Sequence, residues 1–415
     1  MTILFYIINH TKIVGIKKGV KMIYLDNAGT TKVSEHVKQT MLPFFDEIYG
    51  NASSLHSLGQ RAKEYLEQAR QDVAKCLNAK PNEIYFTSGG SESDNLAIRS
   101  MCKNALKNGK NHIITSAFEH HAVLNTLLDM KKQGFEITYL PVYENGIVRV
   151  EDLKNAITDK TFLVTIMFAN NEIGTIQPVK EIGEICREKG VIFHTDAVQA
   201  VGHIKIDVDD MKIDMLSLSS HKFHGPKGVG ALYVRKGIPF KAEITGGSQE
   251  KNKRAGTENL AGIVGMATAL KDACDEMEQV SKKETILRDK LFNELSKISH
   301  SKINGDTKNR LPNNFNMSFE GIEGESLLLL LDDKGICASS GSACTSGSLD
   351  PSHVLLAIGL IHEIAHGSLR LTLSKYTTEE EIDKTIKEVP PIVEYLRKMS
   401  PIWDRLEKGE LKHAI

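Results

Sequence analysis

The stretch EIYFTSGGSESDN, residues 83–95, decides the fold class, because a short apolar run passes through two glycines into a helix-forming segment. Its β-branched and aromatic residues are typical of a buried strand, and a helix is predicted from about Ser91. Backbone N–H groups at such a junction, together with the helix dipole, can bind an anion. Taken alone, the junction could equally be an ordinary helix cap, and it lacks the G-K-[ST] of a Walker loop.

The same alternation of short strands and longer helices continues along the chain. Six further β-branched runs follow: HIITS (112–116), EITYLPV (136–142), FLVTIMFAN (162–170), VIFHTDA (191–197), MLSLSS (215–220) and GALYVRK (230–236). This alternation predicts an α/β fold with a mainly parallel sheet of seven strands. In such a sheet, ligands bind beyond the carboxyl ends of the strands.

The pattern changes near residue 260, where long charged helices cover 262–299. The strands NFNMSF, GICASS and SLRLTLS come next, so we predict a smaller α+β domain. The final segment, 379–400, reads as a polar amphipathic helix interrupted by Pro390 and Pro391. We expect a large domain over 34–264, a small C-terminal domain over 265–415, and a segment 22–33 that packs with the small domain.

The first 21 residues contain an apolar run of only six residues, with the basic residues after it rather than before it. This pattern fits neither a signal peptide nor a membrane span. We interpret residues 1–21 as a translated leader ahead of Met22.

The overall composition favours a small-molecule substrate. With 52 basic and 53 acidic residues among 415, the net charge of −1 provides no electrostatic footprint for nucleic acid or an anionic membrane. The six cysteines show no C-x-x-C spacing and no dense framework, so we expect reduced thiols and a cytoplasmic location.

Polar clusters stand at the ends of the predicted strands: TSGGSE, EHH, NNEIG, DAVQ and SSHKFHGPKG. Contact of one ligand with many strand ends is the simplest explanation. Lys222 and Asp196 are the lysine and aspartate that pyridoxal phosphate chemistry requires, one to bind the cofactor covalently and one to pair with its ring nitrogen. The alternative is an ordinary surface lysine, since lysines are nearly always exposed.

The segment HEIAH, 362–366, matches the zinc-protease pattern H-E-x-x-H. That chemistry needs both histidines on one face of a sustained helix. Gly359 and Gly367 bracket the motif and a strand-like run follows it, so the helix would be short and the metalloprotease interpretation is disfavoured.

The run ASSGSACTSGS, 338–348, places Cys344 among serines and glycines. One interpretation is a surface loop with an incidental cysteine. The other is a nucleophile on a flexible tether, because Gly- and Ser-rich chain behaves as a flexible linker.

These motifs, in this order, resemble the cysteine desulfurases of the NifS and IscS type, which are fold-type-I pyridoxal phosphate enzymes of the class V aminotransferase superfamily. The resemblance covers nearly the whole chain from Met22 onward. It rests on YLDNAGTT, FTSGGSESDN, ANNEIGTIQP, HTDAVQAVG, SSHKFHGPKGVGALYVR, RAGTEN, SSGSACTSGS and HGSLRLTLSKYTTEEEID.

The resemblance implies a role for each matching residue. Lys222 would bind pyridoxal 5'-phosphate, Asp196 would pair with its ring nitrogen, Gln199 would hydrogen-bond its phenolic oxygen, and His120 would stack on the ring and assist proton transfer. Gly90, Ser91, Ser219 and His221 would hold the phosphate, joined by Thr257 from the other subunit of a homodimer. Asn171 and Arg370 would bind the substrate carboxylate, and Asn171 would also touch the cofactor.

The implied reaction removes sulfur from L-cysteine, releases L-alanine and leaves a persulfide on the nucleophile Cys344. An iron–sulfur scaffold protein would accept the sulfur, and Cys344 would transiently ligate an iron–sulfur cluster through its persulfide. Cys337 is interpreted as structural. A selenocysteine lyase or a related lyase of the same fold is the near alternative, and a non-enzymatic sulfur or metal carrier is the distant one.

Overall fold

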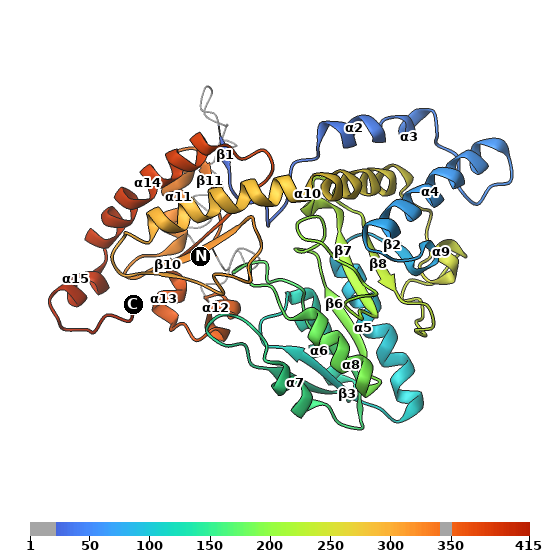
Figure 1. The fold of residues 1–415 in the computed structure, drawn as a ribbon, viewed down its shortest axis with the longest axis horizontal. Coiled ribbons are helices and arrows are strands. Elements are labelled where there is room, and N and C mark those ends of the chain that lie inside the picture. Colours follow the sequence, from blue (N-terminus) through green and yellow to red (C-terminus); the bar gives the residue numbers. More distant parts are fainter. Residues whose placement is uncertain (1–21, 341–350) are drawn as a thin grey trace, which may run out of the picture.

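The computed structural model describes residues 22–340 and 351–415. Two lobes share one long helix, α10, which runs from the larger lobe into the smaller one (Figure 1). No helix within these two ranges is long and apolar enough to span a membrane.

A seven-stranded sheet forms the centre of the large lobe, in the order β2-β8-β7-β6-β5-β3-β4. Only β8 runs against its neighbours, so the prediction of a mainly parallel sheet is confirmed. The strands are β2 (Ile84–Thr87), β3 (His112–Ser116), β4 (Glu136–Leu140), β5 (Thr161–Thr165), β6 (Ile192–Asp196), β7 (Met215–Ser219) and β8 (Gly230–Val234).

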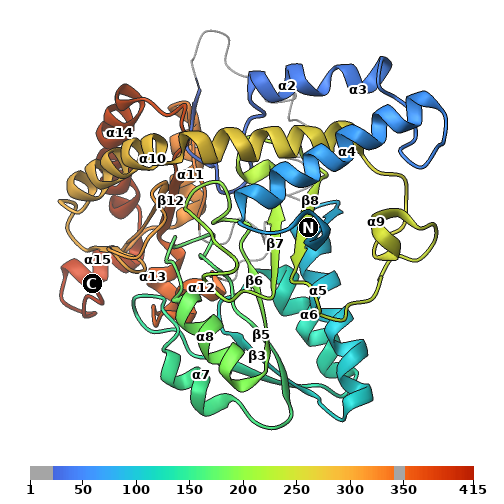
Figure 2. The same ribbon diagram turned by 45° about the vertical axis from the view of Figure 1, so that its right-hand side comes forward.

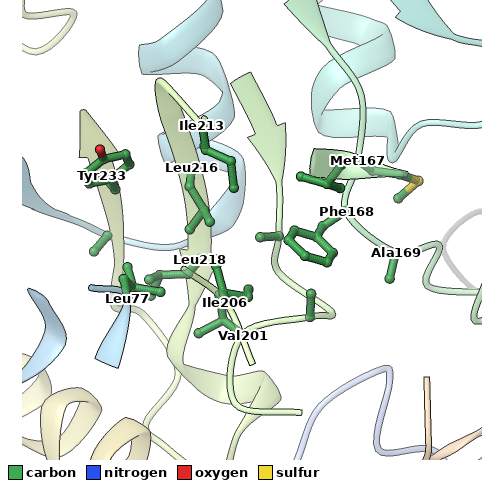
Figure 3. Close-up of a cluster of buried hydrophobic side chains, with 14 of the residues drawn as sticks. Leu77, Met167, Phe168, Ala169, Val201, Ile206, Ile213, Leu216, Leu218 and Tyr233 are labelled. Carbon is green, nitrogen blue, oxygen red and sulfur yellow. The ribbon is translucent and has the colours of Figure 1, made fainter. Parts of the chain in front are cut away.

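Helices cover both faces of this sheet, because successive apolar residues of a strand point to opposite sides. Ile113 packs with α5 and α6, whereas Ile114 packs with α4, α8 and the first half of α10. Figure 3 shows part of the core on the Ile114 side of the sheet, to which Leu77, Val201 and Leu216 belong. The helices of this lobe are α2 (Glu35–Met41), α3 (Pro43–Asp46), α4 (Ser57–Cys76), α5 (Gly90–Ala105), α6 (His121–Lys132), α7 (Val150–Ala156), α8 (Val179–Lys189) and α9 (Gln249–Asn252).

The small lobe contains a three-stranded antiparallel sheet, in the order β12-β10-β9, and a two-stranded parallel pair, β1-β11. Ile23 and Leu25 belong to its core, which places the chain just after residue 22 on the small lobe. Its elements are β1 (Ile23–Tyr24), β9 (Ser301–Ile303), β10 (Asn314–Phe319), α11 (Gly324–Asp333), β11 (Ile336–Cys337), β12 (Ser368–Thr372), α14 (Glu379–Lys398) and α15 (Pro401–Glu407). Helices α12 (His353–Ala357) and α13 (His362–His366) precede β12, and their apolar residues Val354, Leu355 and Ile364 are buried in the core of the large lobe.

Helix α14 corrects one expectation, because it runs without interruption through Pro390 and Pro391. Val389 and Ile392 on either side of the prolines are buried in the core of the small lobe. Packing of this apolar face keeps the helix continuous although each proline lacks a backbone N–H.

Helix α10 (Leu260–Leu295) is the main connection between the lobes (Figure 2). Its first turns, including Val264 and Leu270, are buried in the core of the large lobe. Its last turns, including Leu287 and Leu291, are buried in the core of the small lobe. The expected boundary at residue 265 therefore falls inside one continuous helix.

Candidate active site

A cavity of about 390 Å³ lies where the carboxyl ends of the central strands face the small lobe. The segment after β1 and strand β12 complete its wall. Of the predicted site residues, ten line it: Gly90, Ser91, His120, Asn171, Asp196, Gln199, Ser219, His221, Lys222 and Arg370.

The start of α5 forms one end of the cavity. Gly89 has φ +155°, a conformation that side chains other than hydrogen rarely allow, and a Cβ on Gly90 would lie 2.6 Å from Val198 Cγ2. The glycines therefore bring backbone N–H groups close to Ser219 and His221, at the positive end of a 16-residue helix. This end of the cavity suits a phosphate group.

Three buried carboxyl groups, Asp94, Glu119 and Asp196, interact beneath the cavity. Burial raises the pKa of Asp94 well above its usual range, and the neighbouring Asp196 raises it further. Burial also raises the pKa of Asp196, but His120, the Val198 N–H and Lys222 oppose this rise. Asp196 is accordingly the member of the group best placed to carry the negative charge.

Asp196 Oδ1 accepts a hydrogen bond from the Val198 N–H at 2.9 Å. The carboxylate is only 5% exposed, and no cationic side chain within the described residues lies in salt-bridge contact with it. A buried anion of this kind calls for a cationic partner in the cavity.

The loop after β3 contains Glu119, and α6 begins two residues later, at His121. Glu119 Oε1 accepts hydrogen bonds from Ser116 Oγ and from the Met167 N–H, which joins the ends of β3 and β5. Burial raises the pKa of Glu119 to about 8.

His120 caps α6, and its Nδ1 accepts a hydrogen bond from the Ala122 N–H at 3.1 Å. Burial lowers the pKa of His120, and the charges of Lys222 and His121 lower it further, although Asp196 opposes them. The neutral ring therefore carries its proton on Nε2 and can donate from that atom.

Lys222 lies in a short 3₁₀ turn directly after β7. Its Nζ donates to the carbonyl oxygens of Ala28 at 2.6 Å and Gly29 at 2.8 Å. Gln199 Nε2 donates to the same Ala28 carbonyl at 3.1 Å. The segment after β1 thus holds the lysine and the glutamine side by side.

Arg370 enters the cavity from β12 of the small lobe and is 3% exposed. Its guanidinium donates to Asp26 Oδ1 at 2.9 Å and to the Asn171 carbonyl at 3.1 Å. Its Nε is buried without a hydrogen-bond partner in the described part of the chain. A carboxylate is the acceptor that best satisfies an unpaired guanidinium N–H.

The predicted nucleophile Cys344 lies outside the described residues, but both flanks of its segment are placed. Ser339 and Arg370 exchange two backbone hydrogen bonds, of 2.7 and 3.1 Å. On the other side, Ser352 Oγ donates to Glu172 Oε2, next to Asn171. Burial raises the pKa of Glu172 to about 7, while Ser352 and Arg370 oppose the rise.

Thr257 is exposed and does not line the cavity of its own chain. Its predicted contact with the cofactor of a second subunit stays a prediction.

Comparison with known proteins identifies the family. Residues 23–385 match the model of the class-V aminotransferases. The chain belongs to the class-V aminotransferase family. A relative named cysteine desulfurase IscS, from Clostridium botulinum strain Hall, is 55% identical over 393 residues, covering 94% of this chain and 99% of the relative. Another protein of that name, from Methanosarcina thermophila, is 54% identical and covers 92% of this chain and 94% of its own length.

Among solved structures, one titled NifS-like protein superimposes with a TM-score of 0.86 at 40% identity, covering 91% of this chain and all of the other. The predicted fold type and the resemblance to this family are therefore confirmed.

Class-V aminotransferases use pyridoxal 5'-phosphate, and the cavity fits this group. The glycine-lined start of α5 suits its phosphate, and buried Asp196 suits a protonated ring nitrogen. Lys222 lies between these two features, next to Gln199. The predicted cofactor is confirmed by family membership, and the role of each residue toward it stays a proposal.

In this class-V aminotransferase, HEIAH forms the five-residue helix α13, which ends at the glycine before β12. The short helix agrees with the sequence interpretation, and the family membership gives no support to a metalloprotease.

Sequence reasoning missed Asp94, Glu119 and Glu172. Asp94 lies one turn into α5 and Glu119 directly after β3, so each follows a predicted strand. Their position at strand ends could have indicated them, but their burial depends on neighbouring strands and helices that are distant in the sequence.

Proposed function

We propose that this chain is a pyridoxal-phosphate-dependent cysteine desulfurase. It takes sulfur from L-cysteine, releases L-alanine and carries the sulfur as a persulfide on Cys344. The observation that supports this function best is the position of Arg370. Its side chain lines the cavity and has one guanidinium nitrogen, Nε, without a hydrogen-bond partner among the described residues. Its backbone is hydrogen-bonded to Ser339, at the start of the segment that carries Cys344.

Covalent geometry limits the distance between the nucleophile and this cavity. Cys344 follows Ser339 by five residues, and a fully extended chain spans at most about 3.6 Å per residue, or about 18 Å in total. The anchor at Ser339 is therefore close enough for Cys344 to reach a substrate bound by Arg370.

The cofactor, when bound, supplies the electron sink that lets the substrate lose its α-proton. The protein side chains supply the remaining functions. Arg370 and Asn171 orient the substrate carboxylate, and the buried Asp196 carboxylate favours a protonated ring nitrogen. Lys222 Nζ lies within the cavity, where it can move the α-proton.

His120 assists by proton transfer. Because its Nδ1 accepts a hydrogen bond from the Ala122 N–H, the neutral ring keeps its proton on Nε2 and can donate a hydrogen bond from that atom. It can accept the proton of the Cys344 thiol when the contact with Ala122 opens, and its lowered pKa keeps the ring neutral for this step.

The acceptor and the assembly state complete the proposal. We expect a cytoplasmic homodimer in which Thr257 reaches the cofactor of the other subunit, and an iron–sulfur scaffold protein that receives the sulfur. Cross-linking and mixed-subunit experiments with Thr257→Ala test the shared site: one active subunit paired with a defective Thr257 partner should lose activity at one site.

The reaction is tested by purifying the protein, recording its visible spectrum and measuring sulfide and alanine produced from L-cysteine. Equal amounts of alanine and released sulfur are expected in the presence of a reducing thiol. Release of selenide from selenocysteine, without sulfide from cysteine, would favour the selenocysteine lyase instead.

The role of Cys344 is tested with Cys344→Ser, which should retain the cofactor spectrum and bind cysteine, yet release no sulfide. Cys337→Ser is the matched control, because Cys337 belongs to β11 at the base of the same segment. Desulfuration at the normal rate by Cys344→Ser contradicts the proposed nucleophile.

A further inference from the structure

The C-terminal tail folds back on the small lobe, and α15 and the chain end lie beside α13 (Figure 1). Two histidines and one glutamate meet there: His300 before β9, Glu320 after β10, and His413 in the tail. Their nitrogen and oxygen atoms all lie within 4.8 Å of one another. None of these residues belongs to the active-site cavity.

The sheet fixes two of the three groups. Phe319 pairs with Ser301 across β10 and β9, which sets the following Glu320 beside the preceding His300. The Glu320 N–H donates to the His300 carbonyl at 3.0 Å. Arg397 holds the same corner by donating to the backbone carbonyls of Glu320 and His300. The carboxylate of Glu320 is thereby left for other partners.

The tail supplies the third group and orients the carboxylate. Glu320 Oε1 accepts a hydrogen bond from the Ala414 N–H at 2.7 Å. Its Oε2 lies 2.7 Å from His413 Nδ1 and 3.5 Å from His300 Nδ1. The glutamate side chain is 5% exposed, while the two histidine side chains are 31% and 30% exposed, so an ion could enter from solvent.

We propose that His300, Glu320 and His413 bind one Zn²⁺ ion that fastens the C-terminal tail to the small lobe. Two imidazole nitrogens and one carboxylate oxygen form a ligand set that zinc commonly takes. Tetrahedral coordination at about 2.0–2.1 Å separates neighbouring ligand atoms by about 3.3 Å. The observed distances of 2.7 and 3.5 Å lie on either side of this value. The two imidazole rings are stacked, with centroids 3.7 Å apart, so one ring has to turn for both Nδ1 lone pairs to face the same ion.

Two further features support the site. The Ile415 carbonyl oxygen lies 2.9 Å from His300 Nδ1 and can serve as the fourth ligand. The Ala414 N–H, bound to the other oxygen of Glu320, is the kind of outer contact that orients a ligating carboxylate. Binding replaces the proton on each Nδ1 with the metal ion.

The chain contains a second histidine pair, which provides a matched control. The rings of His362 and His366 on α13 lie 4.7 Å apart, in the spacing of the zinc-protease pattern. Within residues 22–340 and 351–415, His300, Glu320 and His413 are the one group of three or more His, Cys, Asp or Glu side chains close enough together to share an ion. The zinc site is therefore expected at the cluster assembled from distant segments rather than at the sequence motif.

The single tryptophan of the chain, Trp403, is a built-in reporter. Its ring centroid lies 5.4 Å from that of His300 and 5.5 Å from that of His413. Ni²⁺ bound by the cluster should quench the tryptophan emission, because an open-shell ion so close to the ring removes its excitation energy.

The experiment titrates the full-length holoenzyme with Ni²⁺ while the tryptophan emission is recorded. Quenching should saturate at one ion per chain, and added Zn²⁺ should restore the emission by displacing Ni²⁺. Quenching that Zn²⁺ does not reverse, or that never saturates, would overturn the proposal.

The ligands are tested separately with His413→Ala and Glu320→Gln. Each should weaken the apparent affinity for Ni²⁺ and Zn²⁺ by at least about tenfold, since even outer contacts of a metal site are worth that much. The double variant His362→Ala/His366→Ala should bind both ions like the wild type. Unchanged binding in His413→Ala and Glu320→Gln, or lost binding in the double variant, contradicts the site. Circular dichroism and the desulfurase rate check that each variant is folded.

Discussion

The active-site cavity and the His300–Glu320–His413 cluster are both sets of polar side chains, but they are assembled in different ways. Most residues of the cavity lie at or after the ends of strands of one mainly parallel sheet, and the small lobe adds Arg370 and the segment after β1. The cluster gathers two strand neighbours and a tail residue more than 90 positions further along the chain. The first kind of site can be predicted from a sequence, because residues that follow parallel strands meet at one edge of the sheet. The second kind depends on where a tail packs.

The two sites should also be energetically independent, because no residue belongs to both. Variants of the cavity should lower the desulfurase rate and leave Ni²⁺ binding intact. Variants of the cluster should weaken Ni²⁺ binding and leave the desulfurase rate unchanged. The following predictions test that separation, from the largest expected effect to the smallest.

Lys222→Ala should have the largest effect. Loss of Nζ removes the one lysine that lines the cavity among the described residues, so activity should fall at least about thousandfold and the visible cofactor spectrum should change. Quenching of Trp403 by Ni²⁺ should stay as in the wild type. Lys227→Ala, an exposed lysine of the same loop, is the control and should keep both spectrum and rate. An unchanged spectrum in Lys222→Ala would rule out this cofactor site.

Asp196→Asn should lower kcat/KM by about 10²–10³-fold, because the amide cannot supply the negative charge that a protonated ring nitrogen needs. The rate should be measured at saturating cofactor. Asp94→Asn is the matched comparison. Since burial and Asp196 raise the pKa of Asp94, an amide mimics its neutral form, and kcat/KM should change by less than about threefold. Equal losses in the two variants would show that the charge is not localised on Asp196.

Glu119→Gln should change the pH dependence of stability. The pKa of Glu119 is about 8 in the folded protein, compared with 4.5 for an exposed glutamate, so the folded state binds the extra proton between these values. The stabilisation of the folded state by this protonated carboxyl group is complete below pH 4.5 and is lost as the pH rises toward 8.

The free energy of unfolding of the wild type should therefore fall by a few kcal/mol across this window, and Glu119→Gln should flatten the decline. Denaturant midpoints measured at both ends of the window check the difference. A wild type and a variant with parallel pH profiles would contradict the raised pKa.

The double variant His362→Ala/His366→Ala should have the smallest effect. Neither histidine lines the active-site cavity or contributes to the three-residue cluster, so stability should change by about 0.5 kcal/mol or less and desulfuration should continue normally. Loss of either activity or metal binding in this variant would show that the two histidine pairs are not separate.

The sequence predicted the sheet and most of the cavity because both follow from local patterns. Each of Gly90, His120, Asp196 and Lys222 stands at the end of a strand or within four residues after it, and parallel strands bring such positions to one edge. Arg370 lies on a different lobe, and only the resemblance to a family connected it to the same ligand.

The surroundings of Glu119 and the continuity of α14 could not be predicted, because both depend on packing against segments that are distant in the sequence. A glutamate after a strand reads as the start of a helix, whereas Glu119 is fully enclosed and joins two strand ends. The prolines of α14 are also misleading in isolation, because the packing of Val389 and Ile392 against the small lobe keeps the helix intact.

Helix α10 has a consequence for how the protein can be divided. Its 36 residues extend over about 54 Å and contribute side chains to both cores. A fragment that ends near residue 264 would keep the sheet but lose Ala267 and Leu270 from the core beneath it. Composition separates the chain into two units near that residue, yet neither unit contains a complete interior of its own. The lobes behave as two ends of one folding unit, in which a cut between the apparent domains damages both.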